Sequence, residues 1–213
     1  MEQKTLETED HLREIALEEL APEIREACSL AGWTDLTPVQ AKSIPYMLAG
    51  KDMMVQSRTG SGKTGAYLLP IIHKINTREN SAQALILVPT RELALQVSKE
   101  AHLLTQGKNI RTAVVYGGVG YHAQLEAFRS GAQIVVGTPG RILDHLLKNT
   151  LSLDHLKILI FDEADRMLSM GFYPDMVKIR KYIPSGKILS SMFSATFPPQ
   201  VVRLADQFLH QSK

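Results

Sequence analysis

The stretch Met53-Met54-Val55-Gln56-Ser57-Arg58-Thr59-Gly60-Ser61-Gly62-Lys63-Thr64 decides the fold of this 213-residue chain. Its first three residues are apolar and lead through Gln56 into a polar, Gly-rich loop of six residues, and a helical pattern begins at Lys63. Gly60 and Gly62 allow the backbone to turn tightly and to direct N–H groups at phosphate oxygens. Lys63 can reach the outer phosphates of a nucleotide, and the Thr64 hydroxyl can ligate Mg²⁺. The stretch therefore predicts a strand, a phosphate-binding loop and a helix.

A second motif, Asp162-Glu163-Ala164-Asp165, follows the apolar run Ile158–Phe161, so its carboxylates are expected at the end of a strand. Mg²⁺ prefers hard oxygen ligands and keeps much of its water, so one carboxylate opposite a Thr hydroxyl suits it. Together the two motifs predict an ATPase site. Its catalytic residues would be Lys63, Asp162 and Glu163, and Thr64 and Asp162 would hold Mg²⁺, largely through water.

Short runs of β-branched and aliphatic residues alternate with longer amphipathic stretches along the chain. The predicted strands are Met53–Gln56, Ala84–Val88, Thr112–Tyr116, Gln133–Val136, Ile158–Phe161 and Ile188–Met192. The predicted helices lie at about 22–31, 38–48, 63–76, 91–106, 121–130, 140–148, 175–182 and 199–209. Continuous apolar runs suit strands that are buried on both faces, and alternation with helices predicts a mostly parallel sheet. The expected fold is α/β, with helices on both faces of that sheet.

A distinctive polar cluster follows the end of every predicted strand. In a parallel sheet these ends share one edge, where α/β proteins bind ligands. Besides the two motifs above, the clusters are Pro89-Thr90-Arg91-Glu92-Leu93, Gly117-Gly118, Thr138-Pro139-Gly140-Arg141 and Ser194-Ala195-Thr196. Taken singly, Thr90 and Thr138 could be helix N-caps, and Gly117-Gly118 could be a turn. Six clusters at one edge favour a shared binding site over six separate structural explanations.

The composition, with 44% hydrophobic and 22% charged residues, is that of a soluble globular protein. No stretch approaches the roughly 18 apolar residues that a membrane span needs, and the N-terminus lacks the layout of a signal peptide, so no membrane partner is expected. Cys28 is the only cysteine, which excludes an internal disulfide and fits a reducing, cytoplasmic setting. We interpret Cys28 as a small buried hydrophobe.

Charge is distributed unevenly along the chain. Residues 1–26 carry nine acidic and three basic side chains, so the remaining residues carry a net charge of about +8. This permits a polyanionic partner without requiring one. We expect residues 1–20 to be an acidic, partly flexible extension and residues 21–213 to form one domain. The seven histidines show no metal-ligand spacing, and nearly all are interpreted as surface or capping residues.

The order and wording of these motifs resemble the DEAD-box ATP-dependent RNA helicases. The resemblance covers roughly residues 20–209 and rests on Thr37-Pro38-Val39-Gln40, Thr59–Thr64, Pro89–Leu93, Thr138–Arg141, Asp162–Asp165 and Ser194–Thr196. It implies the N-terminal RecA-like P-loop domain of such an enzyme, with ATP and Mg²⁺ as cofactors. It also implies RNA as a partner, as a single strand or short duplex that is bound independently of sequence and locally opened.

The resemblance further implies roles for individual residues. Gln40 would read the adenine edge, because a side-chain amide donates and accepts at once, and Glu163 would orient or deprotonate the attacking water. The nucleotide-binding residues would be Trp33, Gln40, Ser57, Thr59, Gly60, Ser61, Gly62, Lys63 and Thr64. The RNA-binding residues would be Pro89, Thr90, Arg91, Gly117, Gly118, Thr138, Gly140 and Arg141. The residues that couple the nucleotide site to RNA and to a second domain would be Asp165, Ser194 and Thr196. For Arg91 the alternative is an internal ion pair with a neighbouring carboxylate.

The chain departs from the family's pattern at three points. No Phe, Tyr or Trp precedes Trp33, so the upstream aromatic that stacks on adenine in the family has only Ile15 or Leu17 in its place. Ser57 stands where the family commonly has Ala. Nothing after Thr196 resembles the family's second RecA-like domain with its arginine finger. Because such a finger is worth about 10³–10⁵ in turnover, the chain alone is expected to bind nucleotide but to hydrolyse it very poorly.

Two other interpretations stay open at this level. One is a naturally short, non-catalytic module that senses nucleotide or clamps RNA. The other is a different P-loop NTPase, such as a DNA helicase or a transporter ATPase.

Overall fold

A computed structural model describes residues 12–209 of the protein. Its centre is one sheet of six parallel strands. The spatial order is β1-β6-β5-β2-β4-β3, and every neighbouring pair is parallel. The strands are β1 (Met53–Gln56), β2 (Ala84–Leu87), β3 (Thr112–Val115), β4 (Ile134–Gly137), β5 (Ile158–Asp162) and β6 (Leu189–Ser194). The predicted α/β fold with a parallel sheet is therefore confirmed.

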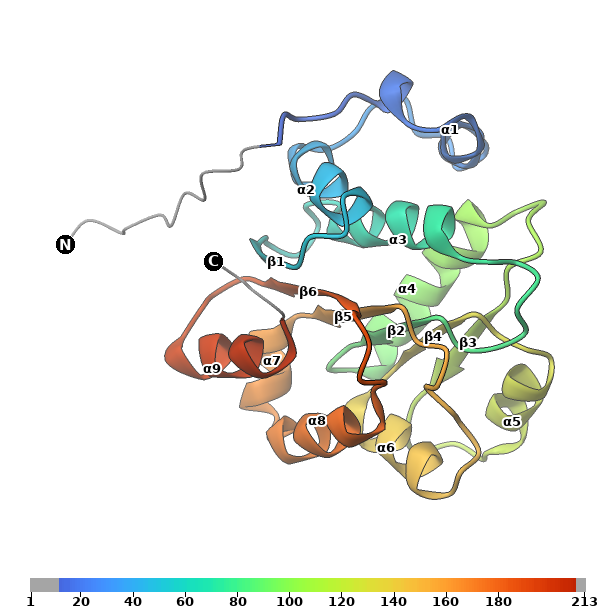
Figure 1. Cartoon of the computed structure of the whole chain (residues 1–213), viewed down its shortest axis with the longest axis vertical. Coiled ribbons are helices and arrows are strands. Elements are labelled where there is room, and N and C mark those ends of the chain that lie inside the picture. The colour runs from blue at the N-terminus through green and yellow to red at the C-terminus, as the bar shows by residue number, and fades with distance from the viewer. Residues whose placement is uncertain (1–11, 210–213) are drawn as a thin grey trace.

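Helices cover both faces of this sheet (Figure 1). One face carries α1 (Pro22–Leu30), α2 (Pro38–Leu48), α3 (Lys63–Lys74) and α4 (Arg91–Leu104). The other carries α5 (His122–Arg129), α6 (Pro139–Leu147), α7 (Ala164–Ser169), α8 (Tyr173–Ile179) and α9 (Pro199–Phe208). Within β2, Ile86 belongs to the core under α1–α4, whereas Leu85 and Leu87 belong to the core on the other face. Both faces exclude water, which explains why these strands are continuous apolar runs.

All six predicted strands are present: β1 has the predicted bounds, and the ends of the other five differ by at most two residues. β5 extends to Asp162 and β6 to Ser194, so the first residue of the acidic motif and the first residue of Ser194–Thr196 still belong to their strands. The prediction missed α7, which contains Ala164 and Asp165 of the acidic motif. It also missed the break between α8 and the 3-10 helix Arg180–Tyr182. Six residues are too few for a helical period to stand out in the sequence.

Residues 12–20 lie against the first face of the domain, and residues 1–11 of the expected extension are outside the described part. A 3-10 helix spans Leu17–Glu19, Leu20 is buried, and the Ile15 N–H donates to Ala41 O over 3.1 Å. Cys28 on α1 is completely buried, and burial raises the pKa of its thiol to about 11. This confirms its interpretation as a core residue. Within residues 12–209 no helix is long and apolar enough to cross a bilayer.

Gly137, the last residue of β4, provides a test of the packing between β3 and β4. A Cβ on Gly137 would lie 2.3 Å from Val115 O and 2.9 Å from the Val115 side chain. We expect Gly137→Ala to lower the free energy of unfolding by about 1–3 kcal/mol, because the strands must move apart to fit the methyl group. Urea denaturation measures this loss. The matched control is Gly186→Ala, where the added methyl meets open space, and equal midpoints for the two variants would contradict the argument.

Candidate functional site

The carboxyl ends of the six strands meet at one edge of the sheet, as the sequence predicts. Gln56 pairs in register with Ser194, Asp162 with Phe193, and Gly137 with both Leu87 and Val115. The polar clusters that follow these strands are therefore neighbours in space although they are far apart in the chain. At this edge the acidic motif lies two strands away from the Gly-rich loop, with β6 between them.

The Gly-rich loop between β1 and α3 has the backbone that a phosphate cradle needs. Gly60 and Gly62 have φ angles of +81° and +90°, in the left-handed region that residues with a Cβ rarely adopt. The Ser57 N–H donates to Ser194 O over 2.9 Å, which fixes the start of the loop to the end of β6. Lys63 and Thr64 open α3 and are both largely buried.

Lys63 lies between the two carboxylates of the acidic motif. Its Nζ is 2.9 Å from Asp162 Oδ1 and 3.4 Å from Glu163 Oε1. Burial raises the pKa of the fully buried Asp162 carboxyl, and the Lys63 charge opposes that rise without cancelling it. A buried cation that contacts two carboxylates makes this loop and the end of β5 one electrostatic unit.

Glu163 is held from three sides in an unusual backbone conformation. Besides Lys63, its carboxylate accepts hydrogen bonds from the Thr59 hydroxyl at 3.3 Å and from Arg166 Nη1 at 3.2 Å. Its φ of +54° is rare for a residue with a Cβ, so the backbone is strained at the junction of β5 and α7. Arg166 is a member of the site that the sequence analysis did not single out.

The oxygen atoms at this edge fit a Mg²⁺ ion. Thr64 and Asp162 offer one hydroxyl and one carboxylate, both hard ligands, and the described residues contain no cluster of three or more His, Cys, Asp or Glu that could hold a metal. A sparse donor set of this kind suits Mg²⁺, which keeps several waters and shares phosphate oxygens. Ser61 Oγ is buried without a hydrogen-bond partner, so the loop also has an unused polar atom.

Gln40 is bound into the loop in a way that its predicted role did not include. The Thr37 N–H donates to Gln40 Oε1, and Gln40 Nε2 donates to Gly62 O, each over 2.9 Å. These two bonds fix which end of the amide is oxygen. Each end keeps one unused hydrogen-bonding position, so Gln40 can still offer a donor and an acceptor together.

Trp33 lies against the start of α3. A Cβ on Gly65 would come within 2.3 Å of the Trp33 ring and 2.6 Å of Gln40 Nε2, so the missing methyl of Gly65 makes room for both side chains. Ile15 and Leu17, which stand where the family has its adenine-stacking aromatic, pack against the core under α1–α4. Trp33, Gln40 and the Gly60–Thr64 loop therefore lie side by side and form one continuous surface, here called the nucleotide wall.

Asp165 contacts both of the other predicted coupling residues. Thr196 donates to Asp165 Oδ2 from its N–H at 3.0 Å and from its hydroxyl at 2.8 Å, and the Asp165 N–H donates to Ser194 Oγ at 3.1 Å. Burial alone would raise the pKa of Asp165, but the bonds from Thr196 and Ser194 outweigh burial and lower it. These three hydrogen bonds join the end of β6 to α7.

The two helix starts of the predicted RNA-binding set differ in their capping. Thr90 Oγ1 accepts the Leu93 N–H at 3.2 Å, so Thr90 is a true N-cap of α4. Thr138 occupies the N-cap position of α6 without a side-chain cap bond. The exposed Arg91 guanidinium lies over the Tyr116 ring, 4.9 Å from its centre, and within residues 12–209 it forms no ion pair. The alternative of an internal ion pair for Arg91 is therefore wrong for the described residues.

Arg141 holds the loop that contains Gly117 and Gly118. Its Nη2 donates to Val119 O, and its guanidinium lies 4.2 Å from the centre of the Tyr121 ring. Its Nη1 is buried without a hydrogen-bond partner. A charged donor in that position is costly unless something accepts its hydrogen bond, which is a reason to expect an anionic ligand here.

His145 corrects the expectation that nearly all histidines are surface or capping residues. It is completely buried on α6, with Nε2 2.8 Å from Gln124 Oε1 and Nδ1 2.8 Å from Thr150 Oγ1. Gln124 Nε2 in turn donates to Tyr116 O at 3.2 Å, so this network supports the base of the Gly117–Gly118 loop. Burial lowers the pKa of His145. His145 follows Ile142 by three residues on the apolar side of α6, and this spacing was the sequence signal for its burial.

The interpretation as surface or capping residues is confirmed for four other histidines, which are exposed: His73, His102, His122 and His155. His11 and His210 lie outside the described residues.

Two polar residues next to the acidic motif, the buried Tyr67 and the half-buried Glu100, were not anticipated from the sequence. The Tyr67 hydroxyl donates to Asp162 Oδ2 over 2.9 Å. Glu100 on α4 is close to Asp162 and Thr64, and burial is the main cause that raises the pKa of its carboxyl to about 7. Both occupy positions that read as ordinary members of amphipathic helices, so only the packing of α3 and α4 reveals them.

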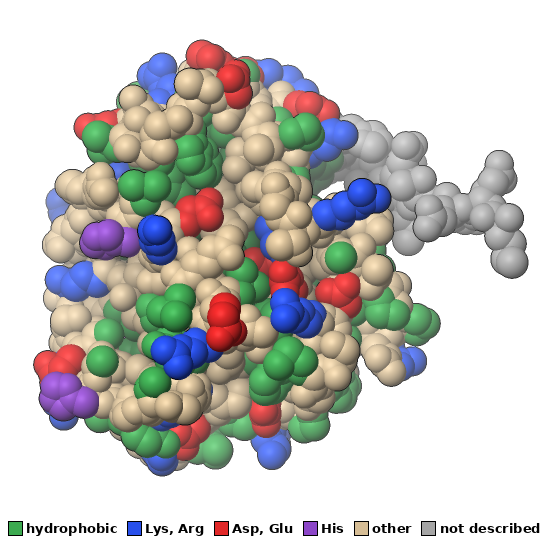
Figure 2. All heavy atoms as spheres, turned by 180° about the vertical axis from the view of Figure 1, so that it is seen from behind, with side chains coloured by type: hydrophobic (Ala, Val, Ile, Leu, Met, Phe, Trp, Pro, Cys, Tyr) green, Lys and Arg blue, Asp and Glu red, His purple; other side chains and the backbone are tan. Residues whose placement is uncertain are grey.

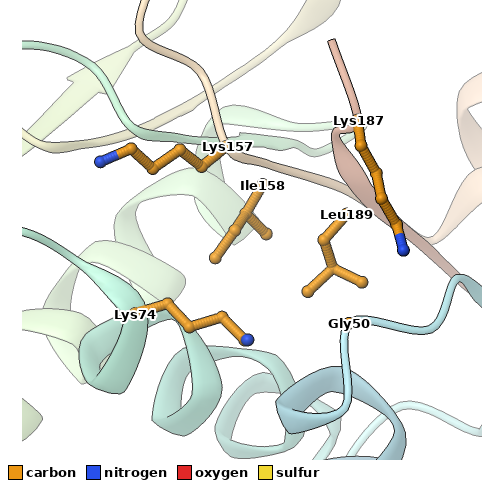
Figure 3. A pocket seen from close by; sticks show the side chains of 6 residues that line it. All are labelled: Gly50, Lys74, Lys157, Ile158, Lys187 and Leu189. Atoms are coloured by element: carbon orange, nitrogen blue, oxygen red, sulfur yellow. The ribbon is translucent and has the colours of Figure 1, made fainter.

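A hollow of the described surface lies at the opposite edge of the sheet. It has a volume of about 300 Å³ and is lined by Gly50, Lys74, Lys157, Ile158, Lys187 and Leu189 (Figure 3). Lys74 Nζ donates to Leu48 O, and Lys157, whose ammonium points away from the hollow in Figure 3, pairs with Glu79. Lys74 and Lys157 therefore have structural partners.

Figure 2 shows acidic and basic side chains interspersed over the face turned away in Figure 1, so charge alone does not mark a site there.

A parallel sheet with a Gly-rich loop opening α3 and an acidic pair at the end of β5 defines a RecA-like P-loop domain. The chain belongs to the DEAD/DEAH box helicase family, whose profile matches residues 37–204. It is 47% identical over 191 residues to the ATP-dependent RNA helicase CshA of Listeria monocytogenes, an overlap that covers 90% of this chain and 36% of that protein. Identity to the DEAD-box ATP-dependent RNA helicase CshA of Geobacillus kaustophilus is 41% over 192 residues, 90% of this chain and 41% of the relative.

A solved structure supports the same assignment. The crystal structure of a DEAD box protein from the hyperthermophile Methanococcus jannaschii superposes with a TM-score of 0.88 at 40% identity, over 93% of this chain and 55% of that one. The chain thus spans about two fifths of the length of the two curated relatives. The resemblance inferred from the motifs is confirmed at the level of family and fold.

The hydrogen bonds of Asp165 with Thr196 and Ser194 should make the free energy of unfolding depend on pH. Because the folded-state pKa is lowered, its stabilisation is present above the unfolded pKa of about 3.9 and is lost as the pH falls through the folded value. We expect Asp165→Asn to cost about 1 kcal/mol at pH 7, since solvent screens this half-exposed group. The difference from the unsubstituted protein should shrink toward pH 3. Urea unfolding between pH 3 and pH 7 measures it, with the exposed Asp206→Asn as control. A loss that does not change with pH would refute the assignment.

Proposed function

We propose that this chain binds ATP or ADP with Mg²⁺ at the Gly60–Thr64 loop and RNA along the adjacent edge, as the first RecA-like domain of an ATP-dependent RNA helicase. The observation that carries the proposal is the contact of the loop lysine, Lys63, with both carboxylates of the acidic motif at the end of β5. A cation and a carboxylate pair facing each other across a glycine cradle suit a phosphate chain and its metal.

Each residue of the nucleotide wall has a distinct task in this proposal. The loop N–H groups and Lys63 bind the phosphates, and Gln40 offers its free donor and acceptor positions to the adenine edge. Thr64 and Asp162 would hold Mg²⁺, which supplies charge neutralisation for the phosphates when bound. Glu163, held by Thr59 and Arg166, would orient or deprotonate the attacking water.

Efficient hydrolysis is proposed to require a second RecA-like domain. The curated relatives extend well beyond the segment that this chain matches, which leaves room for such a domain in their sequences. An arginine finger supplied from there would add about 10³–10⁵ in turnover. Asp165, Ser194 and Thr196 join β6 to α7 at this edge and would carry the coupling between the two sites.

RNA is proposed to contact the other half of the edge through its sugar–phosphate backbone. The buried, unpartnered Nη1 of Arg141 and the exposed Arg91 supply positive charge there, and the N-terminus of α4 adds free N–H groups. The further members of this set are Pro89, Thr90, Gly117, Gly118, Thr138 and Gly140. Contacts of this kind do not read bases, so binding would be independent of sequence.

Replacement of Lys63 tests the nucleotide site. We expect Lys63→Ala to weaken ADP binding in the presence of Mg²⁺ by about tenfold to a hundredfold, the worth of charge-assisted hydrogen bonds to phosphate. Titration with a fluorescent ADP analogue measures the affinity. Lys187→Ala, at the opposite edge of the sheet, is the matched control. Urea unfolding of both variants separates lost binding from lost folding, and unchanged affinity in a folded Lys63→Ala protein would exclude the proposed site.

Replacement of Arg91 tests the nucleic-acid face. If Arg91 neutralises one phosphate of a single strand, Arg91→Ala should weaken binding to unrelated RNA sequences equally and reduce the slope of log K against log salt by about 0.7. Fluorescence anisotropy over a range of salt concentrations measures this, again with Lys187→Ala as control. A loss confined to one RNA sequence would contradict backbone binding, and preference for DNA over RNA would defeat the RNA assignment.

A further inference from the structure

Tyr67 occupies a position on α3 from which it reaches the acidic motif. It follows Thr64 by three residues, so the two side chains lie on the same side of the helix. Its side chain is completely buried, and its ring meets Phe193 of β6 edge to face, with centroids 5.3 Å apart and planes at 65°. The ring is therefore fixed by packing, and the hydroxyl has a defined direction.

The two oxygens of the Asp162 carboxylate have different partners. Oδ2 accepts the Tyr67 hydroxyl over 2.9 Å, whereas Oδ1 lies 2.9 Å from Lys63 Nζ. Oδ1 forms its ion pair with the loop lysine, so this oxygen lies on the side of the phosphate loop. A carboxylate anchored through one oxygen cannot rotate freely about its Cβ–Cγ bond. Tyr67 thus determines which oxygen of Asp162 faces the loop.

Tyr67 also touches the other oxygen ligand proposed for Mg²⁺. Thr64 lies close to the Tyr67 hydroxyl, whose hydrogen bond goes to Asp162 Oδ2, so the phenol oxygen is next to both residues. One buried hydroxyl therefore lies beside both ligands.

We propose that Tyr67 is a positioning residue for the Mg²⁺ site: its hydroxyl anchors Asp162 Oδ2 beside Thr64, so that Asp162 Oδ1 faces the phosphate loop. The inference rests on the proposed binding of nucleotide with Mg²⁺. Mg²⁺ demands near-ideal octahedral geometry, and hydrogen bonds from the residues behind metal ligands are what hold such ligands in place. A ligand pair with a loosened shared anchor would meet this demand less often.

Tyr67→Phe removes the hydroxyl and keeps the ring that packs on Phe193. The affinity for a fluorescent ADP analogue is measured over a range of Mg²⁺ concentrations and again in EDTA. We expect the affinity in EDTA to stay the same, while the Mg²⁺ concentration needed for half of the Mg²⁺-dependent gain rises about 10–100-fold. Tyr173→Phe is the matched control, because it removes a tyrosine hydroxyl that accepts a 2.8 Å bond from Gln207 on the other face of the sheet.

A second metal makes the test independent of general loosening. Ca²⁺ accepts irregular coordination, so Tyr67→Phe should shift the Ca²⁺ dependence of binding less than the Mg²⁺ dependence. Equal losses with Mg²⁺, with Ca²⁺ and in EDTA would mean a structural effect on the loop and would overturn the inference. An unchanged Mg²⁺ midpoint in the variant would also overturn it while leaving the proposed function intact. Failure of the unsubstituted protein to bind nucleotide would overturn the proposed function, and this inference with it.

Discussion

The contact of Lys63 with Asp162 and Glu163 is the constraint on which the rest of the site depends. All three side chains are withdrawn from water, Asp162 completely, and an isolated charge in that position would cost several kcal/mol. The ion pairs therefore require the Gly-rich loop, the start of α3 and the end of β5 to stay in one arrangement. A phosphate chain offers Lys63 the same kind of partner, so this arrangement is suited to exchange one anion for another.

Hydrogen bonds extend this constraint along the edge of the sheet. Ser57 is tied to Ser194 O, and Asp165 is tied to Thr196, so the loop after β1, the end of β6 and α7 share their anchors. Farther along, Arg141 and the buried His145–Gln124 pair support the Gly117–Gly118 loop. The Gly60–Thr64 loop and the Gly117–Gly118 loop thus rest on separate networks that are built on one rigid sheet. A sheet buried on both faces provides that rigidity.

Much of the fold was predictable because the controlling signal is local. The central strands β2 and β5 are buried on both sides, so Ala84–Leu87 and Ile158–Phe161 stand out as uninterrupted apolar runs, whereas α7 is too short to show a period. The positions of the motif residues were predictable for the same reason, since each follows a strand. Their partners were not. Tyr67, Glu100 and His145 look like ordinary helix residues until α3, α4 and α6 are packed, because burial and the neighbours across the core give them their chemistry.

The succession of strands and longer helices, the glycine cradle and the family to which the chain belongs can all be inferred from the sequence alone. These properties depend on the period of apolar residues and on the special backbone of Gly60 and Gly62, which a short segment carries within itself. Only the tertiary structure decided that Gln40 binds Gly62 O, that Arg91 lies over Tyr116, and that Asp162 shares its carboxylate between Lys63 and Tyr67. Hydrogen bonds and ion pairs between distant segments depend on distances of a few tenths of an ångström, and the packing of the helices on the sheet sets those distances.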